Sequence, residues 1–386
     1  MEKTNHYFDW AATSPSDSQI LEEALQQTLK CWGNPSSTHS TGKAARQLLE
    51  EARATAANVM NVKPEHIYFT SGGTESDHIP LLSVLTKPSK GTVLISSIEH
   101  PAMREQANAL KHLGWNVVFI PADKRGIITP DAVTKLLTND TMIVCVMAVN
   151  NETGAIQPVY QIADAITEHC EGKRRPKFHV DCVQAAGKIP LDISYKGIDS
   201  AAFSAHKICG PRGIGILYSK EKIEPFLCGG GQEKGIRSGT ENVFGALAFS
   251  KCLEKYFLTK ETENYKAFRK ISDEFVKKLS ELKGCTIVPS ARLETPELYS
   301  PYVVQAAFSH IPGNVMLRAL DAEGFCISTG SACSSKKNNR PVLEAMQVPS
   351  EIRENSVRFS FGPVTTAADL DDLFFAVSKI NSTFNK

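Results

Sequence analysis

Apolar residues return along this chain at two spacings that alternate with one another. Where they return every three or four positions the pattern predicts amphipathic helices, because an α-helix has 3.6 residues per turn. The clearest helical segments are residues 18–30, 42–60, 74–85 and 159–169. Short β-rich runs lie among them at 67–70, 92–96, 117–120, 142–149, 178–181 and 215–218. This alternation predicts an α/β fold whose mostly parallel sheet is covered by helices on both faces.

The pattern changes after residue 239. Residues 240–282 are helix-rich and dense in Lys and Glu. Strands then return among further helices at 303–308, 326–328 and 357–361. The change predicts a domain boundary near residue 260, followed by a smaller α+β domain.

Length and composition narrow the class of protein. A chain of 386 residues can bury a large core and form two or three domains. Its 42% hydrophobic and 22% charged residues are typical of a soluble globular protein. A net charge of +1 gives no electrostatic reason to expect a nucleic acid or membrane partner. The longest apolar run, residues 142–149, is far shorter than the ~18 residues that span a bilayer, and the first residues lack an apolar signal core.

The ten cysteines are scattered along the chain. Several lie in apolar segments, for example Cys145, Cys182 and Cys326, and no two have C-x-x-C spacing. Buried structural thiols suit a reducing compartment, so we expect a cytoplasmic protein without a metal site.

Lys207 stands at the end of an apolar, strand-like stretch. Residues 201–203 lead into Ser204, His206 and Lys207, and a Gly/Pro turn follows. A lysine at the edge of a buried strand loses hydration, so its pKa should fall and its amine become neutral. A neutral amine can form an imine with an aldehyde, which is how pyridoxal phosphate (PLP) is held. The alternative is a lysine whose amine extends to solvent at a strand end.

Two other predicted strand ends carry groups that suit PLP. Residues 70–76 join a strand to a helix, and their glycines, hydroxyls and free N–H groups could cradle a phosphate. Asp181 follows apolar residues, and a buried carboxylate there needs a partner such as a protonated pyridine nitrogen. The alternatives are an N-capped turn at 70–76 and an ordinary helix cap at Asp181.

Three more polar residues follow predicted strands or lie at strand ends. His100 follows the 92–96 strand and could stack on a ring and act as acid or base, although most lone histidines do neither. Asn151 and Arg358 offer an amide and a guanidinium, and Arg358 could hold a carboxylate bidentately. Both could equally be structural, and the nearby Arg353 is a competing candidate.

Cys333 differs from the other thiols in its surroundings. Small polar residues at 328–335 predict an exposed, mobile loop, and Lys336, Lys337 and Arg340 continue it. Nearby positive charge favours a thiolate over a thiol, whose unperturbed pKa is ~8.5. An exposed thiol can lack a function. A thiol among small residues and positive charges, however, suits a nucleophile that must move with its loop.

Together these segments resemble the NifS/IscS-like cysteine desulfurases of the class V aminotransferase superfamily. The matches run in the family's order from residues 7–13 and 33–39 to 356–360 and cover nearly the whole chain. The most specific are Ser-Ala-His-Lys at 204–207 and Gly-Ser-Ala-Cys-Ser at 330–334.

The resemblance implies an aspartate aminotransferase-like, fold type I, PLP-dependent transferase. Its large PLP-binding domain would comprise residues 15–260. Residues 1–14 and 261–386 would form the small domain that carries the Cys333 loop.

The resemblance also implies roles for individual residues. Lys207 would form the imine with PLP, His100 would stack on the ring as a further catalytic group, and Cys333 would accept the sulfur. The other cofactor contacts would be Asp181 at the pyridine nitrogen, Gln184 at the ring hydroxyl, Gly73 beside the cofactor, and Thr74, Ser204, His206 and the partner subunit's Thr240 at the phosphate. The substrate carboxylate would be held by Asn34, Asn151 and Arg358.

The implied reaction converts L-cysteine to L-alanine and transfers the sulfur to Cys333 as a persulfide. The enzyme would be a homodimer with a shared active site, passing sulfur to an acceptor such as an iron–sulfur scaffold or into thio-cofactor or tRNA synthesis. Selenocysteine lysis or another class V aminotransferase activity is the alternative. A second alternative is a non-catalytic interaction protein. The presence together of four candidate functional residues argues against it: Lys207, Asp181, His100 and Cys333.

The chain departs from the family's pattern at several positions. Asp77 and His78 stand where a pair of asparagines is commoner, and Thr329 stands for a serine. Cys182 replaces a usual alanine and Cys209 a usual tyrosine. None of these changes removes a group that the reaction needs.

Overall fold

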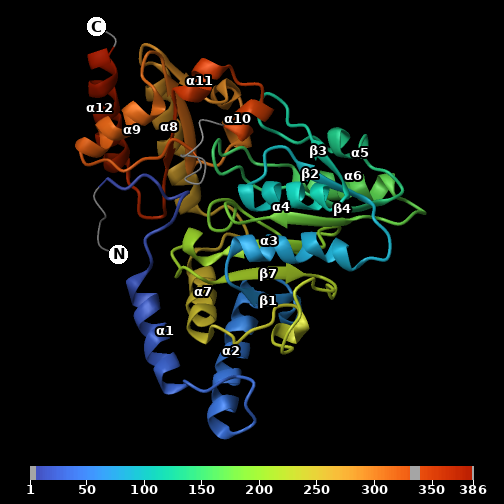
Figure 1. The fold of residues 1–386 in the computed structure, drawn as a ribbon. Helices are drawn as coiled ribbons and strands as arrows, with labels where there is room; N and C mark the ends of the chain where they lie inside the picture. The colour runs from blue at the N-terminus through green and yellow to red at the C-terminus, as the bar shows by residue number, and fades with distance from the viewer. Residues whose placement is uncertain (1–5, 331–339, 385–386) are drawn as a thin grey trace.

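The computed structural model describes residues 6–330 and 340–384, and a seven-stranded sheet lies at its centre (Figure 1). Its strand order is β1-β7-β6-β5-β4-β2-β3. The strands are β1 (Ile67–Thr70), β2 (Thr92–Ser96), β3 (Asn116–Ile120), β4 (Thr141–Cys145), β5 (Lys177–Asp181), β6 (Ser200–Ser204) and β7 (Gly215–Ser219). Only β7 runs antiparallel to its neighbours, so the predicted mostly parallel sheet is confirmed.

Helices cover both faces of this sheet. They are α1 (Ser18–Lys30), α2 (Ser40–Val59), α3 (Gly73–Leu82), α4 (Pro101–His112), α5 (Pro130–Thr134), α6 (Val159–His169) and α7 (Val243–Tyr256). Val93 and Ile95 of β2 pack in a cluster with residues of α3 and α4. Leu94, between them, packs in the cluster that includes residues of α2, α6 and α7. Successive strand side chains point to opposite faces, so both faces are apolar and need cover.

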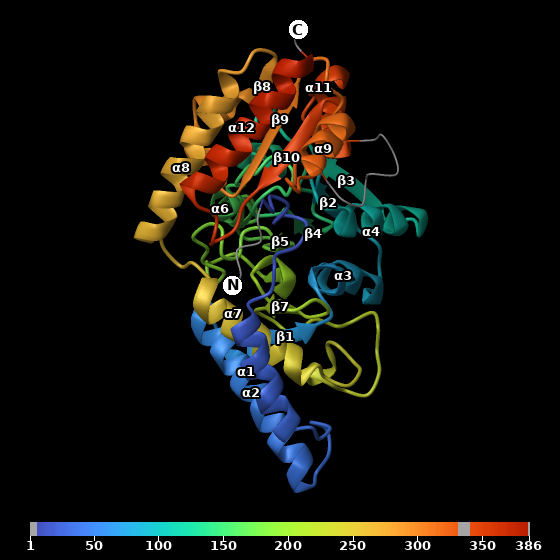
Figure 2. The same ribbon diagram turned by 90° about the vertical axis from the view of Figure 1, so that its left-hand side faces the viewer.

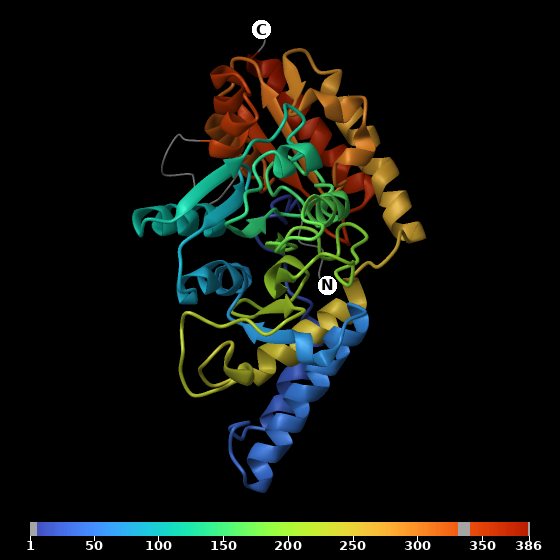
Figure 3. The ribbon, with the colours of Figure 1, turned by 90° about the vertical axis from the view of Figure 1, so that its right-hand side faces the viewer.

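A second, three-stranded antiparallel sheet lies beyond the first, in the order β10-β9-β8. Its strands are β8 (Cys285–Ile287), β9 (Val303–Phe308) and β10 (Ser356–Ser360). Helices α8 (Glu263–Ser280), α9 (Gly313–Ala322), α10 (Pro341–Ala345), α11 (Ser350–Glu354) and α12 (Ala367–Phe384) accompany it. Figure 2 shows α8 and α12 beside this sheet, with α1 and α2 projecting from the opposite end of the molecule, and Figure 3 shows α8 running alongside the sheet from the other side.

The N-terminal segment joins the second sheet. Tyr7 forms an isolated bridge with Cys326, and Asp9 forms one with Ser360 of β10. The predicted domain limits, 15–260 and 1–14 with 261–386, stay a prediction. Within the described part of the chain, no helix is long and apolar enough to cross a bilayer.

Some predicted elements differ from those in the structure. Strand β4 ends at Cys145 within the apolar run 142–149. Beyond it, the N–H groups of Val146 and Ala148 still donate to β5, whereas the Met147 N–H donates to Glu99. Residues 326–328 form two isolated bridges and not a strand. Helix α4 was not predicted, although its buried residues Met103, Ala107 and Leu110 recur at helical spacing.

A buried ion pair fixes the loop after β7 to the large sheet. Arg53 of α2 donates to both carboxylate oxygens of Glu233, at 2.7 and 2.8 Å, and both side chains are almost fully buried. The same carboxylate accepts the N–H of Phe69 in β1 at 2.8 Å.

Replacing Glu233 with alanine should lower the free energy of unfolding by about 3 kcal/mol, because it leaves the buried Arg53 guanidinium with only the exposed Glu50 as a counter-charge. Chemical denaturation measures this loss. The control is Glu221→Ala, which removes an exposed ion pair with Lys177 and should cost about 1 kcal/mol or less. Equal losses in the two variants would contradict the prediction.

Candidate active site

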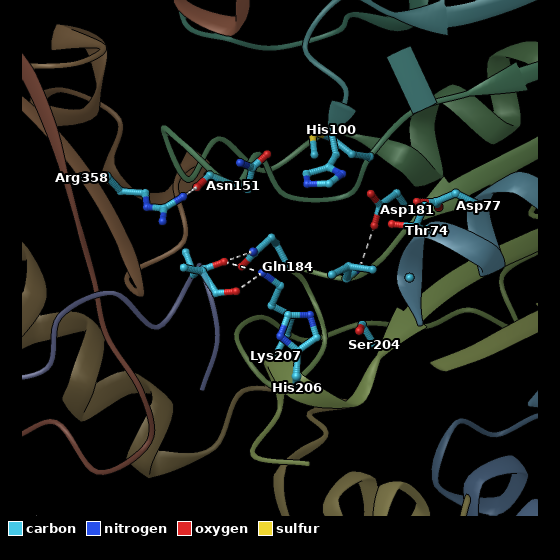
Figure 4. A pocket seen from close by; sticks show the side chains of 15 residues that line it. Thr74, Asp77, His100, Asn151, Asp181, Gln184, Ser204, His206, Lys207 and Arg358 are labelled. Atoms are coloured by element: carbon cyan, nitrogen blue, oxygen red, sulfur yellow. Dashed lines mark hydrogen bonds between the residues drawn. The ribbon is translucent and has the colours of Figure 1, made fainter. Parts of the chain in front are cut away.

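A cavity of about 250 Å³ lies beyond the carboxyl ends of β5 and β6. This is where ligands bind in open α/β sheets. Ten of the residues predicted from the sequence line it (Figure 4): Gly73, Thr74, His100, Asn151, Asp181, Gln184, Ser204, His206, Lys207 and Arg358. The remaining lining residues are Ala11, Ala12, Asp77, Met147 and Val183.

Lys207 ends the short 3-10 turn that follows β6. Its Nζ donates to the carbonyl oxygens of Ala11 at 2.6 Å and Ala12 at 2.7 Å (Figure 4). The amine therefore points into the cavity, where carbonyls of the N-terminal segment hold it. The alternative of a lysine that merely extends to solvent does not fit this geometry.

Asp181 is the last residue of β5 and is buried. Its Oδ1 accepts the N–H of Val183 at 2.8 Å. Burial, together with the nearby carboxyl of Asp77, raises the pKa of Asp181 to about 8. A cationic ligand group beside it would lower that pKa again, so the carboxyl fits a protonated ring nitrogen.

The start of helix α3 offers an anion site at the same cavity. The N-cap residue Gly72 supplies no side-chain acceptor, so the first N–H groups of the helix are left for a ligand. A Cβ at Gly73 would lie 2.7 Å from Cγ2 of Val183, so only glycine fits there. Thr74, Ser204 and His206 line the same cavity. The donor set fits a phosphate group.

His100 is held as a neutral imidazole. It is the N-cap of α4, and its Nδ1 accepts the N–H of Ala102 at 3.2 Å. Burial lowers its pKa to about 4, helped by the positive charges of Lys207 and Arg104. At neutral pH the proton of the ring is therefore on Nε2, as a hydrogen-bond donor.

Arg358 of β10 enters the cavity from the second sheet. Its Nη1 donates to the carbonyl of Asn151 at 2.8 Å, and its Nη2 pairs with Asp9 at 2.7 Å. Buried Nε of Arg358 and Oδ1 of Asn151 have no protein partner. A bidentate grip on a carboxylate would therefore require Arg358 to exchange one existing contact. The competing Arg353 lies in α11 beside Glu344, at 3.5 Å, and does not line the cavity.

Three predicted site residues are not brought to this cavity. Asn34 is exposed between α1 and α2, where its Oδ1 accepts the N–H of Ser36. Thr240 is also exposed, and its predicted action across a dimer stays a prediction. Cys333 lies outside the described residues.

Lys188 is a functional candidate that the sequence did not reveal. It is 5% exposed, and its Nζ donates to Oε1 of Gln184 at 2.5 Å. This contact fixes the Gln184 amide so that Nε2 donates to the Ala11 carbonyl at 2.8 Å. Burial lowers the pKa of Lys188 well below its usual value, and the charge of Lys207 adds to the effect. The available signal was the spacing of four between Gln184 and Lys188.

The raised pKa of Asp181 makes stability depend on pH. The folded state holds this proton up to about pH 8, whereas an unfolded aspartate releases it near its ordinary value of 3.8. Stability is therefore lost as pH rises through that interval, by about 1.4 kcal/mol per pH unit for one group. In cofactor-free protein, Asp181→Asn should lose less stability than wild type between about pH 6 and about pH 8.

Thermal unfolding across that range measures the difference. Glu99, whose pKa burial also raises to about 8, and Asp77, whose pKa burial raises well above its ordinary value, remain in the variant, so the slope should flatten and not vanish. Replacing the exposed Asp131 is the control and should leave the wild-type profile in place. A variant profile as steep as that of wild type would show that Asp181 is ionised in the cofactor-free protein.

Comparisons with known proteins agree over almost the full length of the chain. The family model described as Aminotransferase class-V matches residues 6–373. The cysteine desulfurase IscS of Dictyoglomus turgidum is 35% identical over 374 residues, which are 96% of this chain and 92% of that protein. The NifS/IcsS protein homolog of Lactobacillus delbrueckii subsp. bulgaricus is 37% identical over 98% of both chains.

Solved structures give the same result. A NifS-like protein superposes with a TM-score of 0.89 at 34% identity, covering 98% of this chain and 100% of the other. The structure of SspA in complex with cysteine has a TM-score of 0.80 at 25% identity, covering 94% of this chain and 100% of the other. With its family match over 6–373 and its lysine-centred cavity, this chain belongs to the class V aminotransferase family, among the NifS/IscS-like cysteine desulfurases.

Proposed function

We propose that this protein is a PLP-dependent cysteine desulfurase. It converts L-cysteine to L-alanine and transfers the sulfur atom to the thiol of Cys333, which becomes a persulfide. The observation that carries the proposal is the placing of Lys207, Asp181 and the start of α3 around one cavity. It is supported by relatives named as cysteine desulfurases and by the structural neighbour that binds cysteine.

The cavity residues fit PLP. Lys207 would hold its aldehyde, Asp181 its ring nitrogen, and the α3 N-terminus with Thr74, Ser204 and His206 its phosphate. When bound, PLP supplies an electron sink that stabilises negative charge at the substrate α-carbon.

Two side chains are placed to move protons. The amine of Lys207 is the group that would take the α-proton, because it is the basic nitrogen that points into the cavity from β6. His100 keeps its proton on Nε2, since Nδ1 is occupied by the Ala102 N–H. It can therefore donate to negative charge that develops on the substrate.

The substrate carboxylate would lie against Asn151 and Arg358. Replacing Asn151 with aspartate keeps the side-chain shape but adds a negative charge, so KM for L-cysteine should rise by at least about tenfold. Steady-state kinetics should show a smaller change in kcat. Asn58→Asp on the exposed surface of α2 is the control. An unchanged KM in the Asn151 variant would show that the substrate carboxylate binds elsewhere.

Product analysis tests the function directly. The PLP-loaded protein is incubated with L-cysteine, and alanine, keto acid and alkylated persulfide are quantified by mass spectrometry. Stoichiometric alanine with a persulfide on Cys333 supports desulfuration. A keto acid without persulfide would identify an aminotransferase instead, and faster turnover of selenocysteine would identify a selenocysteine lyase.

The wider setting is proposed from the resemblance to the NifS/IscS-like cysteine desulfurases. We propose a homodimer in which the partner subunit's Thr240 completes the phosphate site. The persulfide would pass to an acceptor protein such as an iron–sulfur scaffold, in a reducing compartment such as the cytoplasm. Trapping the Cys333 persulfide with its acceptor identifies that protein.

A further inference from the structure

Asp77 is a buried carboxyl group that the reaction above does not use. It lies on α3 three residues after Thr74, so both side chains face the cavity. Figure 4 shows Asp77 and Thr74 beside Asp181 on one side of the cavity. Asp77 is 2% exposed.

A chain of hydrogen bonds leads from Asp77 into the sheet. His179 and Asp181 alternate along β5, so both side chains point to the face covered by α3. His179 Nε2 lies 3.1 Å from Oδ1 of Asp77. His179 Nδ1 lies 2.8 Å from Oγ of Ser200, its neighbour in β6. Asp77 thus anchors a side chain next to Asp181.

The groups around Asp77 are mostly acidic. They are His179 and Asp181 from β5, Glu99 before α4, and the thiols of Cys145 in β4 and Cys182 after β5. Among the residues that the structure describes, no lysine or arginine forms an ion pair with Asp77, Glu99 or Asp181.

Three carboxylates in so small a buried space cannot all be ionised. Burial, with the carboxyl of Glu99 adding to it, raises the pKa of Asp77 well above its ordinary value. Burial lowers the pKa of His179 to about 4, so this ring does not supply a compensating positive charge at neutral pH. A neutral acid beside a neutral imidazole satisfies both hydrogen bonds, with Asp77 donating to Nε2 and Nδ1–H donating to Ser200.

We propose that Asp77 is a positioning residue that stays protonated in the working enzyme, donates to His179, and leaves Asp181 as the carboxylate that pairs with the cofactor ring nitrogen. The part that concerns the ring nitrogen rests on the proposed function. The protonation of Asp77 rests on its burial, its contact with His179 and the neighbouring carboxyl groups, independently of the proposed function.

Infrared difference spectroscopy of the PLP-loaded protein tests the protonation. At neutral pH, wild type minus Asp77→Asn should show the carbonyl stretch of a protonated carboxylic acid, with the small shift on deuteration that such a group gives. A pair of ionised carboxylate bands in its place would overturn the proposal. This readout requires no turnover, so it stands even if the protein proves not to be a desulfurase.

Two substitutions test the positioning role. Asp77→Asn keeps a donor and an acceptor, whereas Asp77→Leu leaves His179 Nε2 buried without a partner. The leucine variant should bind PLP about tenfold or more weakly, and the pH at which its bound cofactor changes absorbance should shift. The asparagine variant should restore wild-type PLP affinity. Equal PLP affinity and equal absorbance titrations in the Leu and Asn variants would show that Asp77 does not act through His179.

Discussion

Replacing Lys207 with alanine should reduce cysteine turnover by at least about a thousandfold, because proton transfer by a placed side chain alone contributes 10²–10⁴-fold. The variant loses both the amine that would hold PLP and the base that would take the α-proton. Its kcat is measured with PLP in excess, so that weaker binding does not limit the rate. The covalent link is tested separately by borohydride reduction, after which wild type should retain PLP on denaturation and the variant should not.

The matched control for Lys207 is Lys220→Ala. Lys220 is exposed just after β7 and lies outside the cavity. It should keep wild-type turnover and wild-type retention of PLP. Turnover by Lys207→Ala within about tenfold of wild type would mean that another amine, such as Lys188, serves as the base.

The second large effect is expected for Cys333→Ser. The serine hydroxyl is a far weaker nucleophile than a thiolate toward sulfur, so the variant should form neither persulfide nor alanine. Its cofactor absorbance should match that of wild type, because the residues that line the cavity are unchanged. Alanine release and persulfide alkylation are the measurements.

Cys228→Ser provides the control for a thiol. Cys228 is exposed and free, so an effect of general thiol loss would appear there as well. We expect this variant to desulfurate at the wild-type rate. Near-normal alanine formation by Cys333→Ser would remove Cys333 from the mechanism and direct attention to Cys228 and Cys326, the exposed thiols among the described residues.

The parts of the site that follow strands were predictable from the sequence. Asp181 ends β5, and Lys207 follows β6 by three residues. Apolar runs that end in polar residues and turns mark such positions, and parallel strands bring their carboxyl ends to one edge of the sheet. Local sequence therefore predicted that these residues would lie at one edge of the sheet, where the cavity is found.

The partners supplied by distant segments were not predictable. Lys207 contacts the carbonyls of Ala11 and Ala12, almost two hundred residues earlier. Because every residue has a backbone carbonyl, the sequence does not indicate which of them bind a side chain. Arg358 was a candidate, but its contacts with Asp9 and Asn151 depend on how the two sheets meet. These contacts depend on the tertiary structure, which no local sequence pattern encodes.

Three buried charged residues were missed for a different reason. Asp77, Glu99 and Lys188 are charged residue types. Because charged side chains are seldom fully buried, the sequence alone would place them at the surface. Their burial becomes apparent only from the packing of α3 on β5 and of the N-terminal segment on the cavity. For Asp77 the spacing of three from Thr74 in a predicted helix was the available signal.

The contacts of the N-terminal segment limit when the cavity can form during synthesis. Ala11 and Ala12 are synthesised 196 and 195 residues before Lys207, which they contact, and Asp9 is synthesised 349 residues before its partner Arg358. The large sheet can form during translation, but Arg358 reaches the cavity only after β10 has been synthesised. A chain that ends before β10 would therefore lack Arg358 at the cavity, and its N-terminal segment would lack the bridge from Asp9 to Ser360.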